Sequence, residues 1–183
     1  MLFRSLAEDA LLLAVQDISE NVSAYGAEEI LIEIMGEHSG NWFIKQTIFS
    51  VLHESGITVF ERNDGPELSC MTLQVRPMEL VVEYGDASRP WIIGSKRVER
   101  IAKCELSAIL VDADGSILMT VRTSGVVDDV ISWSDAEVLN GSEEWDWLSG
   151  DLPENRGGGI LEPIIVTGVV ASLVYLFYSS RAD

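Results

Sequence analysis

Residues 97–111 alternate between apolar and polar side chains, and this long segment sets the frame for the rest of the chain. One face of the alternation carries Val98, Ala102, Cys104, Leu106, Ala108 and Leu110, and the other carries Glu99, Lys103, Glu105 and Ser107. A repeat of two residues predicts a β-strand with one face in the core and the other toward solvent. The sequence therefore predicts a long, half-buried strand.

Further strands are predicted on both sides of this segment. Residues 71–75 and 79–84 are expected to be strands separated at Arg76 and Pro77 by a bulge or an edge. Residues 112–115, Asp-Ala-Asp-Gly, are expected to close a hairpin whose second strand, 116–123, returns antiparallel. The same four residues begin like a calcium loop, but the later ligands and the closing Glu are absent, which favours the hairpin.

The N-terminal part predicts helices interleaved with strands. Apolar spacing indicates a first helix over residues 5–20 and a second over 41–54, with Asn41 as the expected N-cap. Residues 27–35 and 57–62 flank the second helix and read as strands, which together predict a right-handed βαβ unit. The predicted fold class is α/β (α+β), with a mixed sheet and two helices on one face.

Residues 160–178 are predicted to form a single C-terminal transmembrane helix, followed by a short tail at 179–183. No charge occurs between positions 163 and 178, and nineteen helical residues span about 28 Å, close to the hydrocarbon thickness. A buried core helix is the competing interpretation. The predicted anchor residues are Pro163, Ile164, Ile165, Val166, Val169, Val170, Leu173, Val174, Leu176 and Phe177, while Gly168 and Ser172 offer a weak site for self-association.

The charge balance excludes one class of partner. The chain has 30 Asp and Glu against 12 Lys and Arg, a net charge of −18. Such a surface repels nucleic-acid phosphates, so no nucleic acid is expected as a partner. An alternative interpretation of the acidity is adaptation to high salt, where repulsion between the charges is screened.

No motif for catalysis, a cofactor or a metal was found. The chain lacks G-x-S-x-G, P-loop, dinucleotide and zinc-ligand spacings, and its only histidines are His38 and His53. We therefore expect no enzyme activity and no cofactor. Cys70 and Cys104 lie in strand-like segments and are expected to be buried free thiols, although a single bridge between them remains open.

Residues 127–155 contain nine acids and no base, with tryptophans interleaved. We predict a domain at 1–130, an acidic stalk or linker at 131–159, and a short helix around 134–140. Trp145 and Trp147 are the residues expected to contact a partner protein or the bilayer interface.

Two short motifs resemble a known family. Residues 56–62, Gly-Ile-Thr-Val-Phe-Glu-Arg, follow a helix, and the long strand turns at residues 112–115. Over about residues 5–130, this order resembles the α/β domain of bacterial envelope-assembly lipoproteins, which include the curli secretion channel, flagellar accessory lipoproteins and the N-terminal domain of the Tol-system propeller protein. The resemblance implies non-catalytic assembly work. Unlike those relatives, the sequence shows no export signal or lipobox cysteine.

These features predict a single-pass membrane protein that acts as a scaffold or accessory subunit of a membrane or envelope complex. Its partners would be the lipid bilayer and other membrane or envelope proteins. The domain is expected to be cytoplasmic, or envelope-facing if an export signal is missing. The alternatives are a membrane-anchored module that binds a small molecule at the ends of the first two strands, and an enzyme of unknown class.

Overall fold

The computed structural model describes residues 2–61, 70–88, 95–140 and 147–153. They belong to one compact unit, Met1–Pro153, and a second unit comprises Glu154–Asp183. The predicted anchor at 160–178 and its residues Gly168 and Ser172 lie outside the described residues. Within those described ranges, no helix combines the length and apolar character that a membrane crossing requires.

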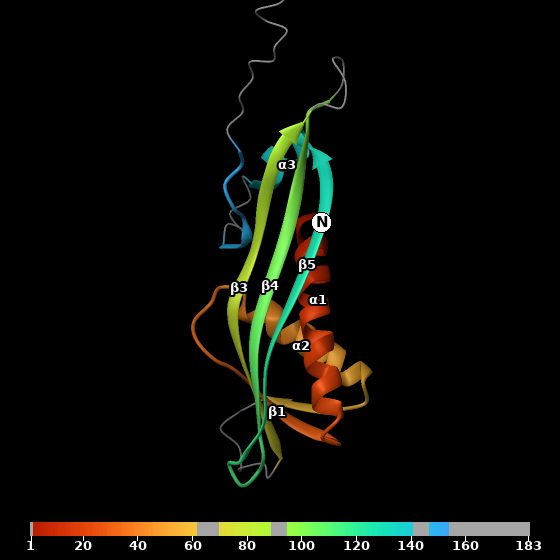
Figure 1. Ribbon diagram of the computed structural model, residues 1–183, viewed down its shortest axis with the longest axis vertical. Coiled ribbons are helices and arrows are strands. Elements are labelled where there is room, and N and C mark those ends of the chain that lie inside the picture. Colours follow the sequence, from red (N-terminus) through yellow and green to blue (C-terminus); the bar gives the residue numbers. More distant parts are fainter. Residues whose placement is uncertain (1, 62–69, 89–94, 141–146, 154–183) are drawn as a thin grey trace, which may run out of the picture. The chain divides into compact units, whose positions relative to one another are not determined.

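The unit is built on a five-stranded mixed sheet, in agreement with the predicted α/β class (Figure 1). The strand order is β2-β1-β3-β4-β5, in which β1 is parallel to β2 and β3 while β3, β4 and β5 are antiparallel. The strands are β1 (Glu29–Ile34), β2 (Thr58–Glu61), β3 (Met71–Ser88), β4 (Arg97–Val111) and β5 (Ile117–Ser132). The predicted parallel βαβ unit and the predicted strand at 97–111 are confirmed.

In the part of the chain that the structure describes, three helices accompany the sheet: α1 (Leu2–Ser23), α2 (Asn41–Glu54) and α3 (Trp133–Asn140). The two helices predicted near the N-terminus are present, and α1 is longer than expected. The predicted cap at Asn41 is wrong, because Gly40 occupies the N-cap and the Asn41 amide instead donates to the Gly36 carbonyl at 2.9 Å.

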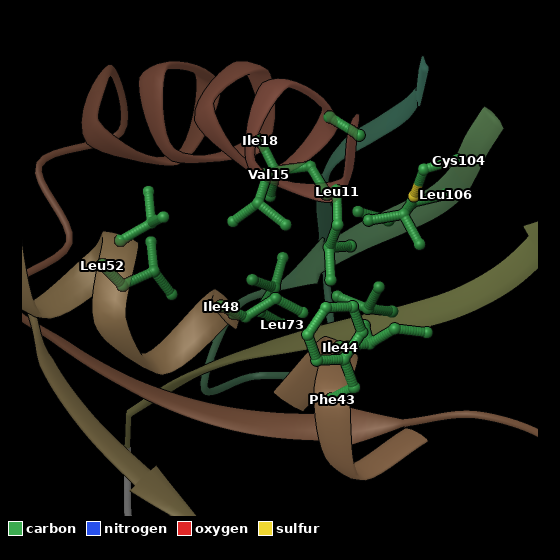
Figure 2. Packing of buried hydrophobic residues seen from close by; sticks show 14 of the residues in the cluster. Leu11, Val15, Ile18, Phe43, Ile44, Ile48, Leu52, Leu73, Cys104 and Leu106 are labelled. Atoms are coloured by element: carbon green, nitrogen blue, oxygen red, sulfur yellow. The ribbon is translucent and has the colours of Figure 1, made fainter. Parts of the chain in front are cut away.

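The core lies on one face of the sheet, where it is covered by α1 and α2. Every second residue of β4 is buried on this face, as the alternation predicts. Figure 2 shows side chains from both helices meeting those of β3 and β4. The labelled contributors are Leu11, Val15 and Ile18 from α1, Phe43, Ile44, Ile48 and Leu52 from α2, and Leu73, Cys104 and Leu106 from the strands.

The two strands predicted at 71–75 and 79–84 are one strand, β3. Pro77 pairs with Leu106 and Glu79 with Glu105, so β3 has one more residue than β4 at this point. The extra residue is Met78, which is exposed. The bulge returns Leu80 and Val82 to the covered face, which explains why the alternation looked broken in the sequence.

Strand β5 continues well beyond the predicted end at residue 123, and the folded unit extends past the predicted domain boundary at 130. The strand reaches Ser132, and α1 packs closely against it: a Cβ on Gly125 would lie only 1.9 Å from the Ala10 carbonyl oxygen. After α3, Leu148 is fully buried in the core. The residues expected to form a stalk are therefore folded wherever the structure describes them up to Pro153.

Candidate functional site

The site is built at the carboxyl end of β1, where the chain leaves the sheet. The Met35 amide donates to the Val75 carbonyl at 2.7 Å, one residue beyond the last pair of the β1–β3 ladder. The chain then turns through Gly36, whose φ of +89° suits glycine. His38 closes the loop by accepting the Gly40 amide on Nδ1 at 2.9 Å, and α2 begins at the next residue.

A second segment joins the same edge of β3 further along. Ser149 forms a parallel bridge with Val82, and the Gly150 amide donates to the Val82 carbonyl at 2.8 Å. In Figure 1 this segment, coloured blue, runs beside β3 on the side away from β4. The edge of β3 between Val75 and Val82 thus lies between two attached segments, and it contains the bulge at Met78.

Trp147 connects these two segments. Its ring lies edge-on to His38, with ring centroids 5.6 Å apart and planes at 88°. The ring also covers Gly40 so closely that a Cβ there would lie 2.5 Å from Trp147 Cζ3. Trp147 is half-buried and belongs to the rim of the main core. Trp145, the other predicted contact residue, lies outside the described residues.

The segments that meet at this joint carry exposed apolar side chains. Trp42, in the first turn of α2, is 50% exposed, and Met78 is 52% exposed. Met35, which follows β1, is also exposed. We call Met35, Trp42, Met78 and Trp147 the tryptophan–methionine surface. Only Trp147 was predicted from the sequence. Trp42 could have been noticed because it precedes the buried face of an amphipathic helix, but no local signal marks Met35 or Met78.

A polar row, fully buried at Arg100, contacts the 147–150 segment. Tyr84 pairs with Arg100 across β3 and β4, and Arg100 pairs with Asp129 across β4 and β5, so the three side chains share the covered face. The Arg100 side chain is fully buried, and it donates Nε to Asp129 Oδ1 at 2.8 Å and a second nitrogen to Oδ2. Burial raises the pKa of the Tyr84 hydroxyl, against a smaller opposing effect of its hydrogen bond with Ser149.

The sequence reasoning missed Arg100, although its even position on the alternating strand placed it on the apolar face. The two hydrogen bonds from Arg100 to the Asp129 carboxylate compensate the buried guanidinium charge, and they fix β4 and β5 in register. Ser149, which bonds to Tyr84, also donates to Asn140 Oδ1 at 2.6 Å. The row therefore ties α3 and the 147–150 segment to the centre of the sheet.

The small-molecule crevice predicted at the ends of the first two strands stays a prediction, and the cavity found among the described residues includes no residue of β2. A cavity of about 350 Å³ lies at the amino ends of β1 and β3. Its walls come from the 26–29 turn, from Cys70 and Met71, and from Asp112 and Ala113 of the β4–β5 turn. The cavity is shallow and wide open, with carboxylates at Glu28, Glu29 and Asp112. Among the described residues, no group of three or more acidic, His or Cys side chains could hold a metal ion.

The remaining predicted sites are explained by local structure. The 112–115 segment is the predicted hairpin turn, with the Gly115 amide donating to the Asp112 carbonyl at 2.9 Å. The Ser116 amide donates to Asp114 at 2.8 Å, and hydrogen bonding from Ser116 holds the pKa of that carboxyl below its usual range. Cys70 and Cys104 are both free thiols, and burial raises the pKa of Cys104 to about 12.

Comparison with solved structures gives distant similarities. The sequence matches no protein-family model and no curated protein. A neuraminyllactose-binding hemagglutinin homologue from Helicobacter pylori superposes with a TM-score of 0.36 at 13% identity, covering 57% of this chain and 67% of that one. A minor lipoprotein from Acinetobacter baumannii gives a TM-score of 0.36 at 12% identity, covering 63% of this chain and 77% of that one.

A third solved structure, lipoprotein B from Nitrosomonas europaea, gives a TM-score of 0.32 at 11% identity and covers 66% of this chain and 73% of that one. Two of these three proteins are bacterial lipoproteins. All three TM-scores are below 0.5, so these similarities carry no argument about family, activity or partners.

Proposed function

We propose that this chain is a membrane-anchored, non-catalytic interaction domain that serves as an accessory or scaffold subunit of a membrane or envelope complex. The domain binds its protein partner through the tryptophan–methionine surface. The bilayer anchor is the 160–178 segment, and Trp145 is a further contact residue predicted from the sequence. Restriction to the membrane raises the effective concentration of the domain near its partner, so a small surface suffices for binding.

The observation that carries the proposal is the exposure of Trp42 and Met78, which belong to segments that meet at one joint. Burial of a large apolar side chain contributes about 1.5–3 kcal/mol, so leaving several exposed together is unfavourable unless a partner covers them. Aromatic residues and methionine are enriched in protein interfaces. Within this surface the half-buried Trp147 packs against Gly40, and the polar row contacts the neighbouring segment.

Site-specific photocrosslinking in native membranes tests the interaction. A photoreactive phenylalanine replaces Trp42, Met78 or Val138 in turn, where Val138 is a matched control on α3 that is 76% exposed. We expect positions 42 and 78 to give an adduct with the same protein, and position 138 to give none. The substitution Trp42→Ser should weaken binding of that protein about 30-fold, the effect of removing a hot spot of about 2 kcal/mol. Equal labelling at all three positions, or none at 42 and 78, would contradict the proposal.

The anchor and its orientation need separate measurements. Deletion of residues 160–183 should release the domain from membranes, and a truncated protein that still sediments with lipid vesicles would contradict the anchor. Protease accessibility of the tagged N-terminus in intact cells, spheroplasts and lysate then gives the side of the membrane. Digestion in spheroplasts indicates an envelope-facing domain, whereas protection until lysis indicates a cytoplasmic one.

A further inference from the structure

Strand β5 forms one edge of the sheet, next to β4 (Figure 1). It is sixteen residues long, and its outer edge pairs with no strand of the described residues. An open edge of this length presents a row of backbone donors and acceptors that can bind another strand.

The hydrogen-bond pattern shows which residues face outward. The Trp133 amide donates to the Lys96 carbonyl at 2.9 Å, directly beyond the pair Ser132–Arg97, and the register is unbroken back to Met119. In an antiparallel ladder, hydrogen-bonded pairs alternate with non-bonded ones. Odd-numbered residues of β5 therefore bond to β4, and the even-numbered residues from 120 to 132 direct their amides and carbonyls to the open edge.

The side chains along this edge are suited to contact. Even-numbered residues lie on the uncovered face of the sheet, and among them Val126 is 60% exposed and Val130 is similarly exposed. On the covered face, the exposed side chain of Leu13 projects from α1 next to Gly125: its Cβ lies 3.1 Å from where a Gly125 Cβ would be. Apolar groups thus flank the edge on both sides of the sheet.

We propose that β5 pairs antiparallel with β5 of a second copy of this chain, about a two-fold axis at Gly125. Charge complementarity selects this register. With the axis at Gly125, Arg122 of each copy faces Asp128 of the other, and Ser124 faces Val126. If the axis moves by one residue, Arg122 and Asp128 both face neutral side chains. An axis between two residues is excluded, because it would pair outward-facing even-numbered residues with odd-numbered residues that already bond to β4.

The paired edges form one continuous ten-stranded sheet. Six outward-facing residues per copy, the even positions from 120 to 130, supply about 12 main-chain hydrogen bonds, one donor and one acceptor each. Arg122 already pairs with Glu105 of β4 on its own chain, which holds its guanidinium on the uncovered face. The two copies of Leu13 approach one another across the axis on the other face. This isologous arrangement is the commonest form of oligomer.

Net charge opposes the association, which gives it a distinctive salt dependence. Each chain carries −18, so two copies repel each other at low ionic strength. At 1 M salt the screening length of this repulsion falls to about 3 Å, whereas the main-chain hydrogen bonds and the apolar contacts remain. The dimer therefore becomes tighter as salt is added, in contrast to an assembly held mainly by opposite charges.

Sedimentation velocity of the full chain in mild detergent tests the proposal at 0.1 M and 1 M NaCl. We expect a monomer–dimer equilibrium that shifts toward dimer at 1 M. Val126→Lys and Asp128→Arg should each raise the dissociation constant at least about tenfold. Val126→Lys places a lysine without an acidic partner opposite Ser124 of the other copy, and Asp128→Arg places an arginine opposite Arg122. The matched control Val138→Lys adds the same charge at an exposed valine of α3 and should leave the constant unchanged.

A charge exchange tests the register itself. Arg122→Asp alone should also weaken the dimer, whereas Arg122→Asp combined with Asp128→Arg should restore it to within about threefold. Circular dichroism of each variant checks that the fold is kept. A monomer at both salt concentrations, a dimer insensitive to all β5 substitutions, or no recovery in the double variant would overturn the proposal. Trp42→Ser leaves this dimer intact, so its outcome is independent of the proposed partner surface.

Discussion

Gly125 is the point at which helix α1 and strand β5 come closest, and its substitution gives the sharpest test of the packing. A Cβ at this position would lie 1.9 Å from the Ala10 carbonyl oxygen and 2.8 Å from the Ala10 carbonyl carbon. Both are backbone atoms and cannot rotate away. To reach an ordinary contact of 3.4 Å, α1 would have to move by about 1.5 Å, the difference between the two distances.

Two effects of opposite sign decide the outcome of Gly125→Ala. Replacing glycine within a strand stabilises by about 0.5–1 kcal/mol, because the unfolded chain loses conformational freedom. Displacing α1 separates its buried side chains from the sheet, and a gap of about 1 Å removes up to half of the dispersion energy of each contact. The affected side chains are Leu6, Ala7, Ala10, Leu11, Ala14, Val15, Ile18 and Val22.

Overpacking of this kind costs about 3 kcal/mol, so the net loss of stability is about 2 kcal/mol. For a folded unit of this size, that loss lowers the midpoint of thermal unfolding by about 4–8 °C. Thermal unfolding followed by circular dichroism measures it, with the exposed neighbour Ser124→Ala as the matched control, which should shift the midpoint by less than about 2 °C. A Gly125→Ala protein as stable as the parent would refute the close approach of α1 and β5.

Three further outcomes follow from the same structure. Asp129→Ala should destabilise the protein by about 3 kcal/mol, because the buried Arg100 charge then lacks this carboxylate. Chemical denaturation of the double variant should show that Arg100→Met recovers most of this loss. If the losses from the two substitutions simply add, the pairing of Arg100 with Asp129 is contradicted. In the native protein at pH 8, a thiol reagent should modify the partly exposed Cys70 and spare Cys104, whose pKa is raised to about 12, until denaturant is added. Because the pKa of Asp114 is lowered in the folded state, its carboxylate stabilises the turn above about pH 4 and this contribution disappears as the pH falls below that value. Asp114→Ala should therefore flatten the acid side of the stability–pH profile, and an unchanged profile would show that the Ser116 hydrogen bonds do not matter.

The candidate surface could be anticipated only in part. Trp147 stood out in the sequence as a tryptophan among acids, and the structure places it beside His38 and over Gly40. Trp42 and Met78 gave no comparable signal, since one lies in an ordinary amphipathic helix and the other in a bulge. The joint that brings their segments together depends on the path of the chain after β1 and on the return of residues 147–150 to β3. Neither event leaves a local pattern in the sequence.

The elements that the sequence determined by itself are those with an uninterrupted local period. The two-residue period predicted β4 at residues 97–111, the helical period predicted α2 at 41–54, and the Asp-Gly turn predicted the hairpin at 112–115. Each depends on interactions among neighbouring residues, so its boundaries are visible in the sequence. The mixed sheet and the βαβ unit followed from the order of these elements.

The tertiary structure alone decided which broken patterns continue and which polar residues are buried. One bulged residue, Met78, unites two apparent strands into β3, and close packing of α1 at Gly125 accompanies the extension of β5 to Ser132. Arg100 is buried because Asp129 on the neighbouring strand satisfies its charge. These outcomes depend on partners far away in the chain, and a local period carries no information about such partners.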